Sequence, residues 1–231
     1  MDAISSVRSL VVRIGILGGT GPAGSALAAR LASVGFDVVL GSRSAERAQT
    51  TTSELLAKWP GRKLQIEPAD NMGAAATDLV VLATPWDGAS QTVKSVEQFL
   101  HGKVVISMAN ALTRIGSEFQ PLVPPRGSVA ASVQAAVPDC QVAAAFHHVP
   151  AKELGDLGHP IESDVLICSD HRRATDATTE LVRKIPNMRP LDAGELSLAT
   201  PIESFTAVLL QLNVRYRTRV AIKFTGIHEG E

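Results

Sequence analysis

The sequence predicts an α/β fold in which helices cover both faces of a doubly wound parallel sheet, followed by a small C-terminal α/β domain. Three observations support this prediction. A short apolar run at residues 11–17 ends in two glycines and is followed by apolar residues at helical spacing. Strand-like and helix-like segments then alternate as far as residue 146, and the alternation changes after the segment 147–150. Because parallel strands must be joined by crossovers, such an alternation favours a parallel sheet.

The expected strands are short and mostly apolar, as strands buried on both faces of a sheet are. They are predicted at residues 11–17, 36–40, 63–67, 78–84, 103–107 and 141–146. The helices between them are predicted at residues 24–34, 44–58, 69–76, 87–100 and 128–137. In the first helix Leu27, Leu31 and Val34 recur at helical spacing, and Pro60 and Gly61 end the second. Together these segments define a first domain over residues 11–146.

The second domain is predicted over residues 147–231. It continues with a strand, a helix and a loop rich in Pro and Gly, at residues 164–168, 171–184 and 186–194. The last helix is expected to open at Thr200, where residues 200–203 (TPIE) match a capping box with proline at the first helical position. Its apolar residues form a stripe made of Ile202, Phe205, Val208, Leu209 and Leu212. Either the domain core, a wall of the substrate cleft or a homodimer contact is expected to cover this stripe.

Composition excludes several classes of partner. The 231 residues carry 22 Lys and Arg against 23 Asp and Glu, a formal net charge of −1. This balance provides neither the basic surface that nucleic acid requires nor a polybasic segment for an anionic membrane. The apolar run at 10–17 is interrupted by Arg13 and is much shorter than the roughly 20 residues that span a bilayer. Residues 1–10 lack the features of a secretory signal, and Cys140 and Cys168 have no CxxC spacing, so we expect a cytoplasmic protein with reduced, buried thiols.

Residues 19–24 read GTGPAG and match the pattern G-x-G-x-x-G at the end of the first expected strand. Glycines such as Gly19 and Gly21 permit a tight turn and close approach of a ligand, and the helix that follows presents free N–H groups to a pyrophosphate. A tight turn without a ligand is the alternative. The strand–turn–helix context favours dinucleotide binding by a Rossmann-type domain.

The end of the second expected strand indicates which dinucleotide is bound. A site that prefers NAD places a carboxylate there, about 20 residues after the glycines, to accept from the ribose 2′-hydroxyl. This chain instead has Ser42 and Arg43, and Arg47 follows one helical turn later. A hydroxyl and two guanidiniums can bind a phosphate, so we predict NADP(H). The alternative is that both arginines are ordinary solvated surface residues.

Thr84, Pro85 and Trp86 follow the fourth expected strand, where the carboxyl edge of the sheet meets the cofactor crevice. We expect them to wall the nicotinamide ribose, with a place in the core as the alternative for Trp86. His147 and His148 are adjacent, so they point to opposite faces of a strand, and no further ligand follows at metal-binding spacing. No metal site is therefore predicted. The pattern G-x-S-x-G is also absent, which argues against hydrolysis.

Five stretches are distinctive in combination: RIGILGGTG at 13–21, VLGSR at 39–43, VLATPW at 81–86, HHVPA at 147–151 and RPLDAG at 189–194. With these stretches most of the chain resembles the NADPH-dependent reductases of coenzyme F420, also called F420:NADP oxidoreductases. The resemblance implies reversible hydride transfer between C4 of NADP(H) and C5 of the 8-hydroxy-5-deazaflavin ring of F420. Such a reaction requires little acid–base chemistry, because the enzyme mainly aligns two rings.

The resemblance also assigns roles to individual residues. The pyrophosphate would be held by Thr20, Gly21, Pro22 and Ala23, and the 2′-phosphate by Ser42, Arg43 and Arg47. The nicotinamide end would be held by Trp86, Ser90, Asn110 and the backbone of Ala151. The deazaflavin, covered by the second domain, would lie near Met108, His147 and Leu191. His147 is also the candidate catalytic residue, as a hydrogen-bond donor to the deazaflavin carbonyl region, with a structural role as the alternative.

Other functions remain open at this point. A non-catalytic NADPH sensor would bind the dinucleotide without turnover, and an NADPH-dependent reductase could use another acceptor. Short-chain dehydrogenase chemistry needs a Tyr-x-x-x-Lys pair, but the only tyrosine, Tyr216, is followed four residues later by Val220. A metal-reductase domain of related fold would need membrane helices to pass electrons onward. The last helix makes a homodimer the expected assembly.

Overall fold

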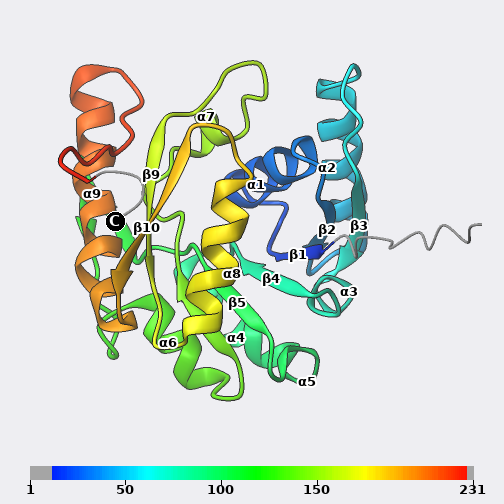
Figure 1. The fold of residues 1–231 in the computed structure, drawn as a ribbon, viewed down its shortest axis with the longest axis horizontal. Coiled ribbons are helices and arrows are strands. Elements are labelled where there is room, and N and C mark those ends of the chain that lie inside the picture. Colours follow the sequence, from blue (N-terminus) through cyan, green and yellow to red (C-terminus); the bar gives the residue numbers. More distant parts are fainter. Residues whose placement is uncertain (1–11, 228–231) are drawn as a thin grey trace, which may run out of the picture.

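The computed structural model describes residues 12–227 and consists of one central sheet with helices on both faces, accompanied by a small hairpin (Figure 1). The strands are β1 (Arg13–Leu17), β2 (Asp37–Ser42), β3 (Ile66–Asp70), β4 (Leu79–Leu82), β5 (Val104–Ser107), β6 (Leu112–Ile115), β7 (Glu118–Pro121), β8 (Gln141–Ala144), β9 (Ser163–Cys168) and β10 (Met188–Gly194). The helices are α1 (Pro22–Ser33), α2 (Ala45–Lys58), α3 (Asn71–Ala75), α4 (Trp86–Ser95), α5 (Glu97–Leu100), α6 (Val129–Ala136), α7 (Ala151–Leu154), α8 (Arg172–Arg183) and α9 (Ala199–Tyr216). Val11, the expected start of the first strand, and the segment 1–10 lie outside the described residues.

The eight-stranded sheet has the order β10-β9-β8-β5-β4-β1-β2-β3. The strands from β3 to β8 pair in parallel, which confirms the predicted doubly wound sheet. β9 then runs antiparallel to β8 through one pair, Ala144 with Cys168, and β10 runs parallel to β9. The carboxyl ends of β8 and β9 therefore lie side by side, and β9 extends beyond the carboxyl edge formed by β1, β2, β3, β4, β5 and β8.

Several elements differ from the sequence prediction. The expected loop at 186–194 is the strand β10, and Pro190 is tolerated there because an edge strand has no second neighbour to bond. The hairpin β6–β7 was not expected. Its strands are short and largely exposed, so they lack the apolar pattern of a buried strand. The predicted helix at 87–100 is divided at Val96 into α4 and α5.

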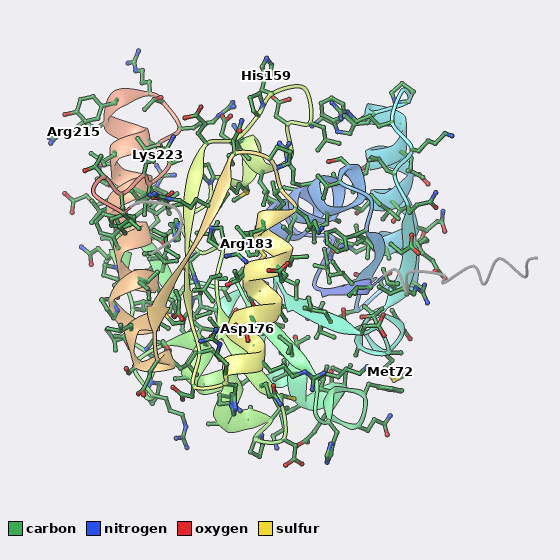
Figure 2. All side chains as sticks on the ribbon, viewed as in Figure 1. Met72, His159, Asp176, Arg183, Arg215 and Lys223 are labelled. Carbon is green, nitrogen blue, oxygen red and sulfur yellow. The ribbon has the colours of Figure 1, made fainter. Side chains whose placement is uncertain are left out.

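Alternation along the strands creates two cores. Ile14 and Ile16 of β1 face the core beneath α1, α7 and α8, whereas Leu17 faces the core beneath α3, α4 and α6. Gly15 is required between them, because a Cβ there would lie 1.8 Å from the carbonyl oxygen of Ala74 in α3. Charged side chains such as Arg183 of α8 are exposed on the outer surface (Figure 2).

The predicted capping box at Thr200 is wrong. α9 begins at Ala199, directly after a 3-10 turn at Leu196–Leu198, so Thr200 already lies inside the helix. The carboxylate of Glu203 is buried and accepts hydrogen bonds from the backbone N–H groups of Val129 at 2.8 Å and Ala130 at 3.0 Å. Glu203 therefore caps α6 rather than its own helix.

Both edge strands of the sheet contain a proline. Pro68 lies in β3, opposite Leu40 of β2, and Pro190 lies in β10, opposite Val165 of β9. These strands are the two ends of the sheet (Figure 1). Proline has no backbone N–H, so neither position can donate a hydrogen bond to a further strand.

Candidate cofactor-binding site

A cleft of about 780 Å³ opens at the carboxyl ends of β1, β2 and β4. Its walls come from the turn after β1, the end of β2, the start of α3 and one side of α4. It brings together Thr20, Gly21, Ser42, Arg43, Arg47 and Thr84, all from the predicted cofactor site. The sheet thus assembles at one edge residues that are far apart in the sequence, as expected for a ligand crevice in an open α/β sheet.

The turn after β1 is built by its glycines. Gly18 has φ +70, in the left-handed region, and the N–H of Gly19 donates to the carbonyl of Gly41 at 2.8 Å. Gly21 is the N-cap of α1, and no side chain among residues 12–227 caps this helix. Because the first N–H groups of a helix have no partner within the helix, they are available to an anion placed at the turn.

Gly21→Ala and Gly24→Ala provide a matched pair of tests for this turn. A Cβ on Gly24 would lie 2.8 Å from the Cα of Gly19, so we expect a loss of about 1 to 3 kcal/mol of folding free energy. A Cβ on Gly21 meets nothing closer than 3.6 Å but would stand in the cleft, so we expect normal stability and roughly tenfold weaker NADPH binding. Thermal denaturation and titration calorimetry measure the two effects. A Gly21→Ala variant with unchanged NADPH affinity would contradict the assignment.

The end of β2 presents two cations to the cleft. The Oγ of Ser44, the N-cap of α2, accepts from the N–H of Arg47 at 3.3 Å, and the Oγ of the buried Ser42 accepts from the N–H of Ser44 at 3.3 Å. The side chains of Arg43 and Arg47 are exposed and, within residues 12–227, have no hydrogen-bond or ion-pair partner. Both guanidiniums are therefore available to a phosphate.

Two parts of the cleft wall, on opposite sides, were not predicted from the sequence. Asn71 lines the cleft at the start of α3 and accepts from the N–H of Gly18 at 3.3 Å, which supports the glycine turn. The opposite wall is a polar face of α4 that includes Gln91, Thr92 and Ser95. The helical spacing of these side chains was the available signal, but a polar helix face is usually solvated surface.

Other predicted cofactor residues lie outside the cleft lining. Gly19, Pro22 and Ala23 support the turn, and Trp86 is the first residue of α4, with 37% of its surface exposed. Ser90 is half-buried on the same helix, and Ala151 is the first residue of α7.

A second polar cluster lies at the carboxyl ends of β5 and β8. Asn110 donates to the carbonyl of His147 at 3.0 Å, and Thr206 of α9 donates to the side-chain oxygen of Asn110 at 3.2 Å. Nε2 of His147 is 3.9 Å from Oε1 of Glu203, and within the described chain neither ring nitrogen of His147 has a hydrogen-bond partner. Met108 is buried nearby in the chain, whereas Leu191 is half-buried in the middle of β10.

Burial controls the protonation of this cluster. It lowers the pKa of His147 to about 3, and the neighbouring His148 acts in the same direction. It raises the pKa of Glu203 to about 7, against the opposing effect of the two backbone N–H donors. His147 is therefore neutral near pH 7, and Glu203 titrates there.

Comparison with known proteins identifies the family. A family model described as NADP oxidoreductase, coenzyme F420-dependent, matches residues 13–111. The F420-dependent NADP reductase of Methanothermobacter thermautotrophicus is 34% identical over 97% of this chain and 100% of its own length. This chain belongs to the F420-dependent NADP reductase family. The reductase of the same name from Methanothermobacter marburgensis is 36% identical over 94% of this chain and 100% of its own length.

Solved structures agree with this family fold. One from Arthrobacter sp. FB24 has a TM-score of 0.77 at 22% identity and covers 92% of this F420-dependent NADP reductase family member and 100% of its own chain. Rat metalloreductase STEAP3 is 27% identical over 90% of this chain, which spans 39% of that protein. Within residues 12–227, this family member has no helix with the length and apolarity needed to cross a membrane.

Proposed function

We propose that this protein is an NADPH:coenzyme F420 oxidoreductase that catalyses reversible hydride transfer between C4 of NADP(H) and C5 of the F420 deazaflavin ring. The cleft is the main observation behind this proposal. In it a glycine turn and two guanidiniums, those of Arg43 and Arg47, line one space, and neither guanidinium has a partner among the described residues. Membership of the F420-dependent NADP reductase family supports F420 as the second substrate.

The cleft residues fit a dinucleotide that carries an extra phosphate. A Cβ on Gly21 would meet only the carbonyl oxygens of Gly18 at 3.6 Å and Ala83 at 3.8 Å, and Gly21 lines the cleft, which suits a pyrophosphate close to the backbone. Thr20, Pro22 and Ala23 would complete this subsite. Ser42, Arg43 and Arg47 would hold the 2′-phosphate, since guanidiniums form charge-assisted hydrogen bonds with phosphate oxygens.

The nicotinamide and the deazaflavin are proposed to meet beyond the glycine turn. Thr84, Trp86, Ser90, Asn110 and the backbone of Ala151 would hold the nicotinamide ribose and carboxamide. The second domain, residues 147–231, would cover the deazaflavin near Met108, His147 and Leu191. Met108 and His147 are buried, so their contact with the ring requires a local rearrangement. Both substrates supply the redox chemistry, and the role of this chain is to align them.

The decisive experiment follows the deazaflavin absorbance of purified protein mixed with NADPH and oxidised F420. We expect rapid bleaching with NADPH and F420, and much slower bleaching when NADH replaces NADPH or when flavin mononucleotide replaces F420. NADPH binding without bleaching would refute the proposal and favour a sensor, or a reductase of another acceptor.

We also propose a homodimer formed through α9. Leu198, Phe205 and Val208 expose 45%, 44% and 48% of their surfaces at the start and along one side of α9, which supports an apolar contact with a second copy. We expect Phe205→Glu to convert the dimer to a monomer in size-exclusion chromatography with light scattering. Met72→Glu is the matched control on α3, where Met72 is 47% exposed. A Phe205→Glu variant that remains dimeric would contradict this interface.

We propose a cytoplasmic location, because the state of the two cysteines fits a reducing compartment. Cys140 and Cys168 are buried, free thiols. Thiols of this kind are usual in proteins of a reducing compartment.

A further inference from the structure

Arg30, in the last turn of α1, is buried, with 6% of its surface exposed. Its guanidinium donates to four backbone carbonyls of a single segment, residues 153–159. Nε donates to the carbonyl of Leu154 at 2.9 Å, and Nη2 donates to those of Glu153, Asp156 and His159 at 3.0, 2.7 and 3.4 Å. Arg30 therefore holds the backbone of this segment, rather than a side chain.

The buried environment of Arg30 makes its hydrogen bonds to these carbonyls necessary. Burial lowers the pKa of this guanidinium, Asp156 opposes the effect and Arg62 adds to it. The carboxylate of Asp156 is itself bonded within the segment, to the N–H of Gly158 at 3.0 Å and to Nδ1 of His159 at 2.9 Å. A buried cation without its acceptors is strongly destabilising, so the carbonyls must stay in place. The shape of segment 153–159 is thus coupled to Arg30.

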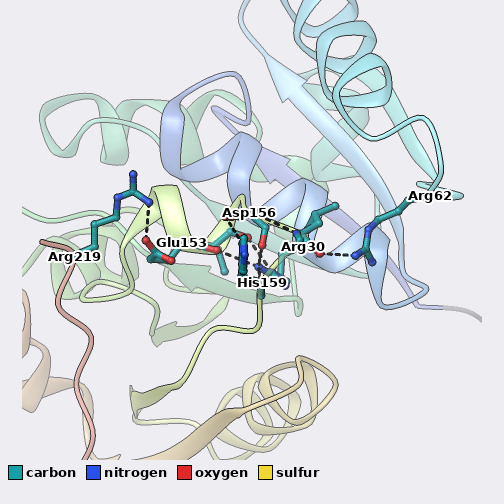
Figure 3. A network of polar contacts seen from close by, with 9 residues as sticks. Arg30, Arg62, Glu153, Asp156, His159 and Arg219 are labelled. Carbon is teal, nitrogen blue, oxygen red and sulfur yellow. Dashed lines mark hydrogen bonds and ion pairs between the residues drawn. The ribbon is translucent and has the colours of Figure 1, made fainter.

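The segment starts at α7 and runs along α1, away from the cofactor edge of the sheet. It continues from α7, which follows the carboxyl end of β8. It packs on α1, because a Cβ on Gly155 would lie 3.1 Å from the Cβ of Ala26, about one turn after the start of α1. Figure 3 shows two more arginines, on opposite sides of this segment: Arg62 donates to the carbonyl of Leu157, and Arg219 pairs with Glu153 at 2.7 Å.

We propose that Arg30 is a positioning residue for the nicotinamide half of NADP(H). One end of α1 forms the glycine turn, and the other end carries Arg30. A helix rises about 1.5 Å per residue, so Pro22 and Arg30 are held about 12 Å apart on one rigid element. Arg30 thereby fixes α7, including the backbone of Ala151, relative to the turn. This inference rests on the proposed function, which assigns the pyrophosphate to the turn and the carboxamide to Ala151.

The test compares a ligand that has the nicotinamide with one that lacks it. Calorimetry gives the affinities of Arg30→Met for NADPH and for 2′,5′-ADP, which contains only the adenosine half. We expect about tenfold weaker NADPH binding, with 2′,5′-ADP affinity unchanged within about twofold. Arg173→Met is the matched control, since Arg173 donates to one carbonyl, that of Gly102 at 3.1 Å, before β5 at the opposite edge of the sheet. It should change neither affinity.

Arg30→Lys keeps a positive charge that can reach some of the carbonyls. This variant is used for the same comparison if Arg30→Met does not fold. Its NADPH affinity should lie between those of wild type and Arg30→Met. Equal losses for both ligands, or wild-type NADPH affinity in a folded Arg30 variant, would overturn the inference. Failure of the wild type to reduce F420 would refute the proposed function instead, because the ratio of the two affinities is measured without F420.

Discussion

Replacing Arg43 by alanine is expected to lower kcat/KM for NADPH by about 10- to 100-fold and to leave kcat/KM for NADH nearly unchanged. A hydrogen bond to a charged group contributes about 1.5 to 3 kcal/mol, and each 1.4 kcal/mol corresponds to roughly tenfold. Arg43 can make such bonds because it lines the cleft and its guanidinium has no partner within residues 12–227. Steady-state kinetics with F420 and each nicotinamide cofactor measure the change.

The double variant Arg43→Ala/Arg47→Ala should lose most of the preference for NADPH, since both guanidiniums of the cleft are then absent. Arg172→Ala is a suitable control because Arg172 is exposed on α8 and, in the part of the chain that the structure describes, pairs only with Asp176, at 2.8 Å. Equal losses for NADPH and NADH would mean that the substitution damaged the fold. An unchanged preference for NADPH would place the 2′-phosphate elsewhere.

Single substitutions at Glu203 and at His147 are expected to change the pH dependence of folding stability in opposite directions. The pKa of Glu203 rises from 4.5 to about 7 on folding, so the folded state binds more protons and stability falls as pH rises through that window. The pKa of His147 falls from 6.5 to about 3, so the unfolded state binds more protons and stability rises between those values. In the wild type the two slopes cancel between pH 4.5 and 6.5.

In each variant, the residue that remains should give the unfolding free energy its own dependence on pH. From pH 4.5 to 6.5, Glu203→Gln should gain about 3 kcal/mol of unfolding free energy, and His147→Gln should lose about as much, at 1.36 kcal/mol for each pKa unit. Urea titrations at half-unit pH steps measure this. Because Glu203 also caps α6, Glu203→Gln loses one N–H acceptor, which should lower its unfolding free energy by the same amount at every pH and leave this slope unchanged. Curves parallel to the wild type in both variants would contradict the prediction.

Sequence patterns correctly predicted the features that depend on residues close together in the chain. The glycine turn, Ser42, Arg43 and Arg47 lie where the strand–turn–helix spacing places them, at one cleft. The role of Glu203 was predicted wrongly, because its partners Val129 and Ala130 are 74 and 73 residues away in the sequence and no local pattern reports them. The reversal of β9 was missed for the same reason, since an apolar strand reads alike in either direction.

The polar wall of α4 was missed because its residues look like solvent-facing surface. Only the fold shows that Gln91 and Thr92 face the same cleft as Arg43 and Arg47. The role of Arg30 could not be predicted from the sequence either. A single arginine near the end of an apolar helix does not indicate that its guanidinium donates to four backbone carbonyls.

Pro68 and Pro190 have a consequence for how this protein behaves when it is concentrated. Exposed strand edges are templates on which other chains can add and form continuous fibrils. Here each open edge of the sheet carries a residue that interrupts such a template. Association through the sheet is thereby disfavoured at both ends. The homodimer proposed through α9 would use a helix contact instead, and such a two-fold contact closes after two copies and does not grow without limit.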